Sequence, residues 1–425
     1  MTGAVGVRRP GPGSLALLAS IVVSSLAASS APTPLYATYA SEWHFSPITT
    51  TVIFGAYAVA VLLTLLVLGR VSDYIGRRPV LVATLAMQLV GMVVLASASG
   101  VAALLVGRVL QGIATGGAMG ALGAAMLDVD QRRGALANAA APGMGTGVGS
   151  LLSGLLVQYV AAPTHLVYLV LIGVFVLQGV GVVLMPETTA RRPGLRAALM
   201  PELAVPQGAR GAMLAAAPIV FAVWALAGFY GSLGPALARQ LSGSTSAVIG
   251  GLGFFLLAVV GSLTTILLNR TGPRTVMLIA IAVLVLAGAG TLATLEESSA
   301  AGFFLCSVVA GVGLGAGFQG GIRTVSPLAA PHERAGLLSV LYVVCYCGMG
   351  IPSVIAGVLA VHGGGLISAA RDYAVFVIVF AIAALAGLVS ANRPVRRSEH
   401  GDQAPEDTHA SALPEEGGRL SVAGE

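Results

Sequence analysis

The sequence predicts an all-α integral membrane protein with about twelve transmembrane helices in two pseudo-symmetric six-helix bundles. The first observation is composition: the 425-residue chain is 56% hydrophobic and only 9% charged, whereas soluble domains carry about 25% charged residues. The second is the length of the apolar runs, because about 20 helical residues cover the roughly 30 Å hydrocarbon layer of a bilayer. The third is that short motifs of the first half recur in the second half.

Apolar runs separated by short polar or glycine-containing segments define the expected spans. They are approximately residues 15–36, 49–69, 79–98, 102–126, 136–159, 165–185, 213–236, 247–268, 275–295, 300–325, 336–360 and 372–391. The first run follows Arg8 and Arg9 and ends in small residues, which is also the pattern of a cleaved signal peptide. We favour an uncleaved first helix because so many further spans follow it.

The longest interior connection separates the sixth span from the seventh and divides the chain into two halves of six spans, the arrangement expected of paired repeats. Three motifs recur in the same order: residues 69–79 in degraded form at 269–274, 130–134 at 332–336, and 143–145 at 348–350. The expected organisation is a cytoplasmic N-terminal tail at 1–14, an N-terminal bundle at 15–185, a central cytoplasmic loop at 186–212, a C-terminal bundle at 213–391 and a disordered cytoplasmic tail at 392–425.

The arginines predict the orientation in the membrane. The chain contains no lysine, so the positive side chains behind its formal charge of +5 are all arginines. With a cytoplasmic N-terminus, the inner loops carry nearly all the loop arginines and the outer loops only Arg239 and Arg371. This asymmetry is the positive-inside pattern. We therefore expect a multi-pass protein of the inner (plasma) membrane, with both termini cytoplasmic and no nucleic acid as partner.

Several functional classes are disfavoured by what the chain contains. Cys306, Cys345 and Cys347 lie inside apolar runs without a C-x-x-C pair, so we expect no metal site and no disulfide framework. The absence of a Walker A motif excludes ATP-driven pumping within this chain, and we expect no cofactor. Histidines and acids do not cluster at one membrane face, and neither tail can form the soluble domain of a sensor. An integral membrane enzyme and a membrane sensor are therefore disfavoured.

A short charged segment, residues 69–79 (GRVSDYIGRRP), joins the second span to the third. Gly76 gives the backbone freedom that a tight turn needs, and Pro79 is tolerated in the first turn of the next helix. The segment resembles the G-x-L-A-D-x-x-G-R-R signature of the major facilitator superfamily, with Val71 and Ser72 in place of Leu and Ala. The resemblance extends from about residue 15 to residue 392, and it implies alternating access between two six-helix halves.

The resemblance also implies a charge cluster that braces the inner gate. In the family, the signature Asp and Arg pair with an acidic residue at the inner end of the fourth helix. The matching positions here are Asp73, Arg77 and Asp128. The expected gating and motif residues are Gly69, Asp73, Gly76, Arg77, Arg78 and Asp128. The alternative is that these charges face the headgroups and fix topology only.

A second motif, residues 107–112 (GRVLQG) in the fourth span, resembles the G-R-x-x-Q-G motif of the same family. Arg108 lies inside the apolar region, where an arginine is costly and should face a cavity or a partner rather than lipid. The resemblance implies a part in proton coupling for Arg108, with Gln111 and Gly112 as its motif partners. The alternative is that Arg108 snorkels to the outer headgroups.

Two further segments support the resemblance. Residues 142–149 of the fifth span (PGMGTGVG) keep the glycine density of the fifth-helix motif of family exporters, but Pro142 precedes the cluster instead of lying within it. Tight helix packing explains these glycines nearly as well. Residues 185–188 (MPET) are similar to the Pro-Glu-Thr that often closes the sixth helix in the family.

Aromatic and amide side chains within the spans are the candidates for a central substrate cavity. Such groups amid apolar walls suit amphipathic or cationic organic molecules, although each residue alone is also explained by packing. The candidates are Tyr57, Gln178, Trp224, Tyr230, Gln319, Tyr342 and Tyr346. Arg323, near the inner end of the tenth span, is interpreted as an interfacial anchor.

The sequence thus predicts a monomeric secondary transporter that exports a small organic molecule in the manner of multidrug efflux proteins, with protons as the possible coupling ion. The alternative is an uptake permease for a sugar or another metabolite, which would line its cavity with more amide and acidic groups. The spans lack Asp, Glu and His near mid-depth, where proton-driven transport usually places a titratable group. Coupling through acids at the rim, a proton carried by the substrate, and facilitated diffusion all remain open.

Overall fold

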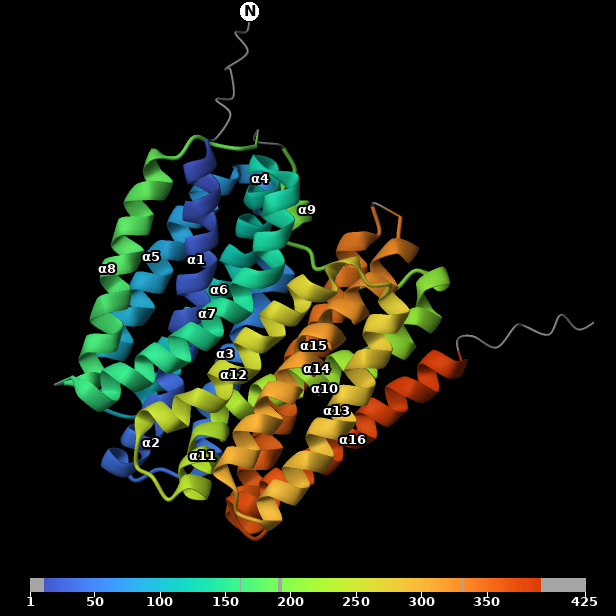
Figure 1. Cartoon of the computed structure of the whole chain (residues 1–425). Coiled ribbons are helices and arrows are strands. Elements are labelled where there is room, and N and C mark those ends of the chain that lie inside the picture. Colours follow the sequence, from blue (N-terminus) through green and yellow to red (C-terminus); the bar gives the residue numbers. More distant parts are fainter. Residues whose placement is uncertain (1–10, 161, 190–192, 331, 391–425) are drawn as a thin grey trace, which may run out of the picture. The chain divides into compact units, whose positions relative to one another are not determined.

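The computed structural model describes residues 11–160, 162–189, 193–330 and 332–390, and within these ranges it contains helices and loops but no strand. Twelve helices of this described part are long and apolar enough to cross a membrane (Figure 1). The prediction of an all-α membrane protein with twelve spans is confirmed. The expected tail at 392–425, and residues 1–10 of the expected N-terminal tail, lie outside the described residues.

The first half of the chain contributes six long helices. They are α1 (Pro12–Ser30), α3 (Pro47–Leu68), α5 (Arg77–Ala96), α6 (Val101–Val129), α7 (Gln131–Tyr159) and α8 (Pro163–Leu184). The second half contributes α10 (Arg210–Ser232), α12 (Ala247–Leu267), α13 (Pro273–Glu296), α14 (Ala300–Val325), α15 (Arg334–His362) and α16 (Leu366–Ser390). The short α-helices are α2 (Pro32–Trp43), α4 (Ser72–Ile75), α9 (Leu195–Ala198) and α11 (Gly234–Ser242), and the 3-10 turns are Gln207–Ala209, Leu268–Arg270 and Ser326–Leu328.

Most spans agree with the prediction to within a few residues, and two of the boundaries that differ have identifiable reasons. The first span runs on through α2 to Trp43, because Pro32 and Pro34 interrupt the helix only briefly. The last helix begins at Leu366 rather than at residue 372. It starts directly after Gly364 and Gly365, whose φ angles of 96° and 94° suit glycine and end the preceding loop. The predicted boundaries follow the polarity of the sequence, whereas backbone conformation sets these two observed boundaries.

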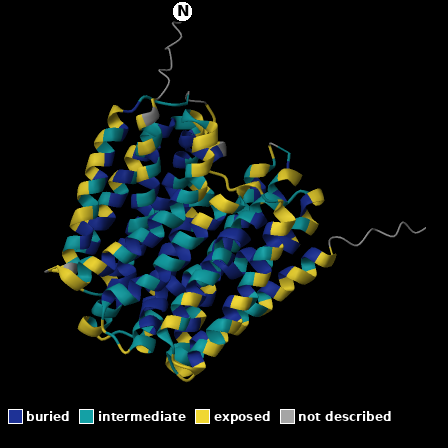
Figure 2. Ribbon diagram, in the orientation of Figure 1, coloured by how far each residue is buried: buried dark blue, intermediate teal, exposed yellow. Residues whose placement is uncertain are grey.

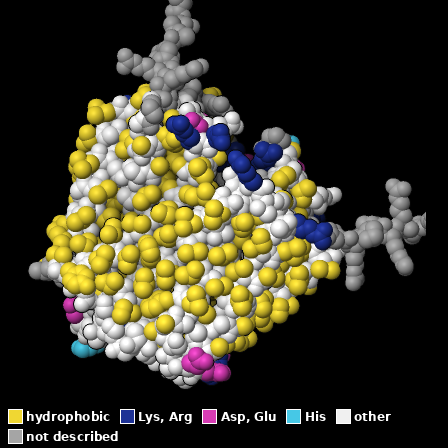
Figure 3. Space-filling model, in the orientation of Figure 1, with side chains coloured by type: hydrophobic (Ala, Val, Ile, Leu, Met, Phe, Trp, Pro, Cys, Tyr) yellow, Lys and Arg dark blue, Asp and Glu magenta, His cyan; other side chains and the backbone are white. Residues whose placement is uncertain are grey.

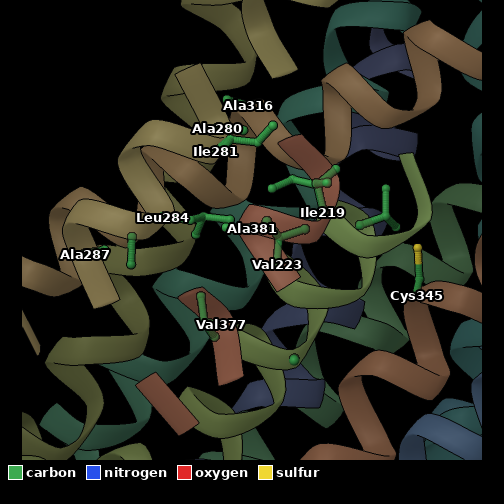
Figure 4. Close-up of a cluster of buried hydrophobic side chains, with 14 of the residues drawn as sticks. Ile219, Val223, Ala280, Ile281, Leu284, Ala287, Ala316, Cys345, Val377 and Ala381 are labelled. Carbon is green, nitrogen blue, oxygen red and sulfur yellow. The ribbon is translucent and has the colours of Figure 1, made fainter. Parts of the chain in front are cut away.

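Each half packs around an apolar core of its own. One core is formed by side chains from the first half and the other by side chains from α10 onward. In Figure 4, Ile219 and Val223 from α10 lie beside Leu284 from α13 and Val377 and Ala381 from α16, and all five are buried. Buried residues concentrate between the helices and exposed ones on the outer faces (Figure 2).

The outer surface of the helices is apolar, as a lipid-facing surface should be. On α8, the side chains of Leu177 and Leu184 are 74% and 79% exposed. Figure 3 shows hydrophobic side chains across the middle of the molecule on this face, with arginine side chains near one end. Because large exposed apolar areas are rare on soluble proteins, this surface fits a bilayer.

The two halves contact each other through α7 against α12 and through α3 against α15. Small residues permit the close approach: a Cβ on Gly251 of α12 would lie 2.6 Å from the carbonyl oxygen of Ser150 of α7. A Cβ on Gly357 of α15 would lie 2.3 Å from Oγ1 of Thr51 of α3. We call the end of the bundle with α4 and α9 the arginine-rich end, and the end with α2 and α11 the opposite end (Figure 1). These two contacts lie toward the opposite end.

Candidate functional site

The charged turn at the arginine-rich end has a conformation that depends on glycine. The chain leaves α3, forms the single turn of α4 and reverses at Gly76, whose φ of 103° is disfavoured for any residue with a side chain. A Cβ on Gly76 would also lie 2.5 Å from Oε2 of Glu187. A Cβ on Gly69 would lie 2.4 Å from the carbonyl oxygen of Leu65, and the backbone of Gly69 lies close to α6, where a Cβ on Gly120 would lie 2.4 Å from the Gly69 carbonyl oxygen. Both motif glycines of this turn therefore have steric roles.

Arg77 lies at the centre of a cluster of polar side chains from three elements. It is 8% exposed. Its Nη1 donates to Oγ of Ser72 at 2.7 Å and forms an ion pair with Asp73. Its Nε donates to Oδ2 of Asp128, at the end of α6, at 3.4 Å, and the hydroxyl of Thr188 donates to the same oxygen at 3.3 Å. The structure thus brings together Asp73, Arg77 and Asp128, all within the first half.

Glu187, which the sequence analysis did not select as a site residue, holds the first turn of α5. Its Oε1 accepts the backbone N–H groups of Arg77 at 2.8 Å and Thr188 at 3.0 Å, and its Oε2 accepts the backbone N–H of Arg78 at 3.1 Å. The start of α5 has no acidic residue in its first turn and no capping side chain of its own. A carboxylate at this position satisfies unpaired N–H groups and complements the helix dipole. The signal in the sequence is the Pro-Glu-Thr motif at residues 186–188, which by itself supports the fold and does not indicate this capping contact.

Glu187→Gln is expected to lower the free energy of unfolding by about 1–2 kcal/mol, because the amide keeps one acceptor oxygen and loses the charge. Thermal denaturation of the purified protein in detergent should show a decrease of several degrees. Glu202→Gln is the matched control, since the side chain of Glu202 is 50% exposed and its ion pair with Arg70 is expected to contribute little. Equal effects of the two substitutions would contradict the capping role.

The connection between the halves lies along the arginine-rich end. Arg70 forms a 2.6 Å ion pair with Glu202, and contact with this carboxylate raises the pKa of Arg70. A Cβ on Gly336, at the start of α15, would lie 3.3 Å from Cβ of Ala204. Residues 202–206 of the connection line a cavity of about 450 Å³. The other side of this cavity is formed by His332, Glu333 and Gly336, at and just before the start of α15. The connection therefore contacts the charged turn of the first half and a helix of the second.

Arg108 is fully buried in α6, where it contacts the kinked first span. Its Nη1 donates to the carbonyl oxygen of Ser29 at 2.7 Å and to the Gln111 side chain, whose Nε2 donates to the carbonyl oxygen of Ala28 at 2.7 Å. Pro32 has no N–H to offer to Ala28, so the break between α1 and α2 frees the carbonyl group that Gln111 uses. The guanidinium also lies 4.2 Å from the ring centroid of Tyr57.

Gly112, the last residue of this motif, lets α6 approach α3. A Cβ on Gly112 would lie 2.6 Å from Cβ of Ala60 and 2.8 Å from the carbonyl oxygen of Tyr57. With Arg108 at 1% exposure, this packing does not fit the snorkelling alternative, in which the guanidinium would reach the headgroups. The motif therefore joins three helices of the first half.

Three of the cavity candidates lie together where the halves meet. Tyr57 of α3 belongs to a small buried cluster against which Trp224 of α10 and Tyr346 of α15 pack. The ring centroids of Trp224 and Tyr346 are 5.0 Å apart. Phe54 and Met349 also belong to this cluster, together with the small side chains of Ala58 and Val61, and no sequence signal distinguishes them from ordinary packing residues. We call Phe54, Tyr57, Trp224, Tyr346 and Met349 the aromatic cluster.

The other candidates occupy different places. Gln178 accepts from Ser24 at 2.9 Å, between α8 and α1. Tyr230 shares a 2.9 Å hydrogen bond with Ser307 inside the second half. Gln319 donates to the carbonyl oxygen of Thr265 at 3.0 Å. These three have packing partners within one half, whereas Tyr342 lies one helical turn from Tyr346 on α15. Arg323 donates to the carbonyl oxygen of Leu268 at 3.3 Å, near the arginine-rich end.

The glycines of α7 alternate between two partners. A Cβ on Gly143 or Gly147 would lie 2.2 Å from Oγ of Ser262 or 2.7 Å from Cγ2 of Val259, both on α12 of the other half. A Cβ on Gly145 or Gly149 would instead lie within 2.5 Å of the backbone of α1. Close packing on both faces accounts for this glycine density.

Comparison with known proteins gives the family. The model of the Major Facilitator Superfamily matches residues 17–292 and 212–422, and no curated protein matches the chain. A bacterial homologue of the human lysosomal transporter Spinster, in an inward-facing and unoccupied conformation, is similar in fold with a TM-score of 0.70 at 15% identity, covering 92% of this chain and 98% of that one. Its inward-facing and occupied form gives 0.67 at 16% identity, with 92% and 97% covered.

The nucleoside transporter NupG gives a TM-score of 0.64 at 12% identity, with 89% of this chain and 98% of that one covered. At these identities the likeness shows the fold alone, and the family rests on the match of the family model over most of the chain. The chain belongs to the major facilitator superfamily.

Proposed function

We propose that this protein moves a small organic molecule across the membrane by alternating access between its halves. As a superfamily member it is a multi-pass membrane transporter of the secondary kind and not an enzyme. The observation that carries the proposal is the aromatic cluster, to which both halves contribute where α3 meets α15. Aromatic faces among apolar walls bind organic molecules well, and a site shared by both halves changes its exposure when they rock.

We propose that the protein lies in the inner (plasma) membrane with its arginine-rich end facing the cytoplasm, as the positive-inside pattern indicates. Both termini then lie inside. The contacts of Gly251 with Ser150 and of Gly357 with Thr51 lie toward the opposite end, so this conformation would be closed to the outside. The likeness to two structures described as inward-facing supports the same assignment.

The cluster of Asp73, Arg77 and Asp128 is proposed to set the balance between the two conformations. Arg77 holds the α3–α5 turn to the end of α6 through Asp128, and to the segment that follows α8 through its backbone N–H, which donates to Glu187. A charge cluster at a low-dielectric rim biases a two-state equilibrium when one state preserves it better than the other. The loop that links the halves contacts the same turn through Arg70 and Glu202, which gives the cluster a route to the second half.

Export is the proposed direction, and protons are the proposed coupling ion. The carboxylates and histidines of the described spans all lie within about two turns of a span end. Asp73 and Asp128, at the arginine-rich end, are therefore the protein groups best placed to exchange protons with the cytoplasm, and a proton carried by the substrate is the other route. An uptake permease for a sugar is less well supported, because the aromatic cluster contains neither amide nor carboxylate side chains.

The test is an efflux assay with a panel of neutral, anionic and cationic aromatic compounds, in cells that lack their own exporters. Expression should lower the accumulation of at least one class, and a protonophore should restore it. A variant with Gly251 replaced by valine, which is expected to disturb the conformational cycle, provides a control for expression alone. Accumulation that is unchanged for every compound, or raised rather than lowered, would contradict export.

A further inference from the structure

The guanidinium of Arg108 has hydrogen-bonding capacity that no described protein group uses. Its Nη1 is bonded, but its Nε and Nη2 are buried without a partner. The hydroxyl oxygen of Tyr36 is also buried without a partner. The exposed fractions of Arg108 and Tyr36 are 1% and 3%. Tyr36 lies seven residues after Ser29, whose carbonyl oxygen Arg108 bonds, and therefore about two helical turns further along the same span.

The charge of Arg108 is also unbalanced. The ion pairs among the described residues involve Arg70, Arg77 and Arg133, and none of them involves Arg108. An arginine remains protonated in any protein environment, and a buried charge without a counter-charge is strongly unfavourable. The carbonyl oxygens of Ser29 and the Gln111 side chain offer dipoles, but no negative charge. The free groups beside this charge can all donate, so the set selects an acceptor that is negatively charged.

Arg108 lies next to the aromatic cluster. Its guanidinium is 4.2 Å from the ring centroid of Tyr57 and 5.9 Å from that of Phe54, and both rings belong to the cluster at the junction of the halves. The apolar side chains of the aromatic cluster and the hydrogen-bond donors of the Arg108 guanidinium are therefore neighbours, with the Tyr57 ring between them. This pairing matches a molecule with an aromatic body and an anionic end.

We infer that Arg108, with the hydroxyl of Tyr36, binds an anionic group, and that the transported molecule is an aromatic or amphipathic organic anion such as a carboxylate. The assignment of the anion to the substrate rests on the proposed function, whereas the anion site itself does not. A free inorganic anion has the same chemistry and is the other source. An organic cation is disfavoured, because it would have to approach a permanent positive charge across one aromatic ring.

The experiment measures binding and needs no transport. The full-length protein in detergent, in a zwitterionic buffer, is titrated with sodium benzoate, benzamide, benzylammonium chloride and sodium chloride, and followed by thermal stability and tryptophan fluorescence. Benzoate should bind, and benzamide and benzylammonium should not. Arg108→Gln should weaken benzoate binding about tenfold or more, and Tyr36→Phe about threefold to tenfold, as expected for the loss of charge-assisted hydrogen bonds.

Two variants serve as matched controls. Arg323→Gln removes another arginine that donates to a helix carbonyl group, and it should leave benzoate binding unchanged. Tyr39→Phe removes a hydroxyl from the same helix as Tyr36, but one that already bonds to Tyr168 at 3.3 Å. It should alter thermal stability more than benzoate binding. Tyr36→Phe, which breaks no hydrogen bond in the protein, keeps the test valid if Arg108→Gln fails to fold.

The possible results separate the two proposals. Benzoate binding that depends on Arg108, with chloride ineffective, supports an organic anion as substrate. Chloride binding that depends on Arg108, with no preference for benzoate, supports the site but assigns it to a free anion. If neither anion binds, or if Arg108→Gln binds benzoate as the unmodified protein does, the inference is wrong. Efflux of a cation without anion binding would leave the transport proposal standing and overturn this one.

Discussion

Arg77→Ala is expected to lower the transport rate at least tenfold while the protein still inserts and folds. The substitution removes the shared partner of Ser72, Asp73 and Asp128. The side chains of Asp73 and Asp128 are 47% and 34% exposed, so water can solvate them once the arginine is gone. The loss in the free energy of unfolding should therefore stay near about 1–3 kcal/mol, below the cost of breaking a fully buried pair.

The effect on transport has a different origin. Without Arg77 the turn between α3 and α5 is no longer held to the end of α6, and the link from Arg70 to Glu202 starts from a mobile turn. A change of about 1.4 kcal/mol in the balance between two conformations shifts their ratio tenfold. Initial rates should be measured with a compound that the efflux panel identifies, at matched expression.

Arg78→Ala is the matched control for Arg77→Ala. It removes the same charge at the next position, but Arg78 is held through its backbone N–H, which donates to Glu187 and survives the substitution. The expected change in rate is less than threefold. Asp73→Asn should resemble Arg77→Ala, because it removes the ion pair while keeping the size of the side chain. Normal rates for Arg77→Ala and Asp73→Asn at normal expression would remove the gating role.

The sequence was sufficient for the membrane architecture because hydrophobic length and loop charge are local properties. Runs of about 20 apolar residues can satisfy their backbone groups only as helices in lipid, so twelve such runs become twelve spans. Helix ends were harder to predict. The extension of the first span to Trp43 depends on how Pro32 and Pro34 are accommodated, and the start of α16 depends on two glycines.

The functional residues were predictable where a motif contains its own partners. Asp73 in α4 and Arg77 at the start of α5 are only four residues apart, and their side chains form an ion pair. The position of Glu187 at the start of α5 depends on the packing of α8 against α5, which no local pattern encodes. Likewise, aromatic residues occur in many spans, and only the way the halves assemble brings Tyr57, Trp224 and Tyr346 together while Tyr230 remains inside the second half.

Gly251→Val is expected to shift the protein away from the conformation described here by at least tenfold. Gly251 is on α12 and faces α7 of the other half, where Oγ of Ser150 donates to its carbonyl oxygen at 3.2 Å. A Cβ at this position would lie 2.6 Å from the Ser150 carbonyl oxygen. Both partners are helix backbone and cannot move aside locally, so overpacking should cost this conformation about 1–3 kcal/mol or more. A state in which the halves separate at the opposite end relieves the clash.

The shift can be measured by thiol labelling at Thr33, which is 1% exposed and donates to the carbonyl oxygen of Gly231 across the opposite end. The reporter Thr33→Cys is placed in a background whose three native cysteines, Cys306, Cys345 and Cys347, are replaced by serine or alanine. In this background, Gly251→Val should raise the maleimide labelling rate at least tenfold, because labelling follows the fraction of molecules open at that end.

Gly315→Val separates a conformational effect from simple misfolding. A Cβ on Gly315 of α14 would lie 2.1 Å from the carbonyl oxygen of Gly261, and both glycines belong to the second half. Because both glycines are in the same half, this clash is present in every arrangement of the two halves. The substitution should therefore lower thermal stability without favouring the open state. Gly173→Val, at a position on α8 with no atom within 4 Å of the added Cβ, should change neither quantity. If Gly251→Val lowered stability as Gly315→Val does and left labelling at position 33 unchanged, the α7–α12 contact would be a permanent part of the fold rather than one that opens during transport.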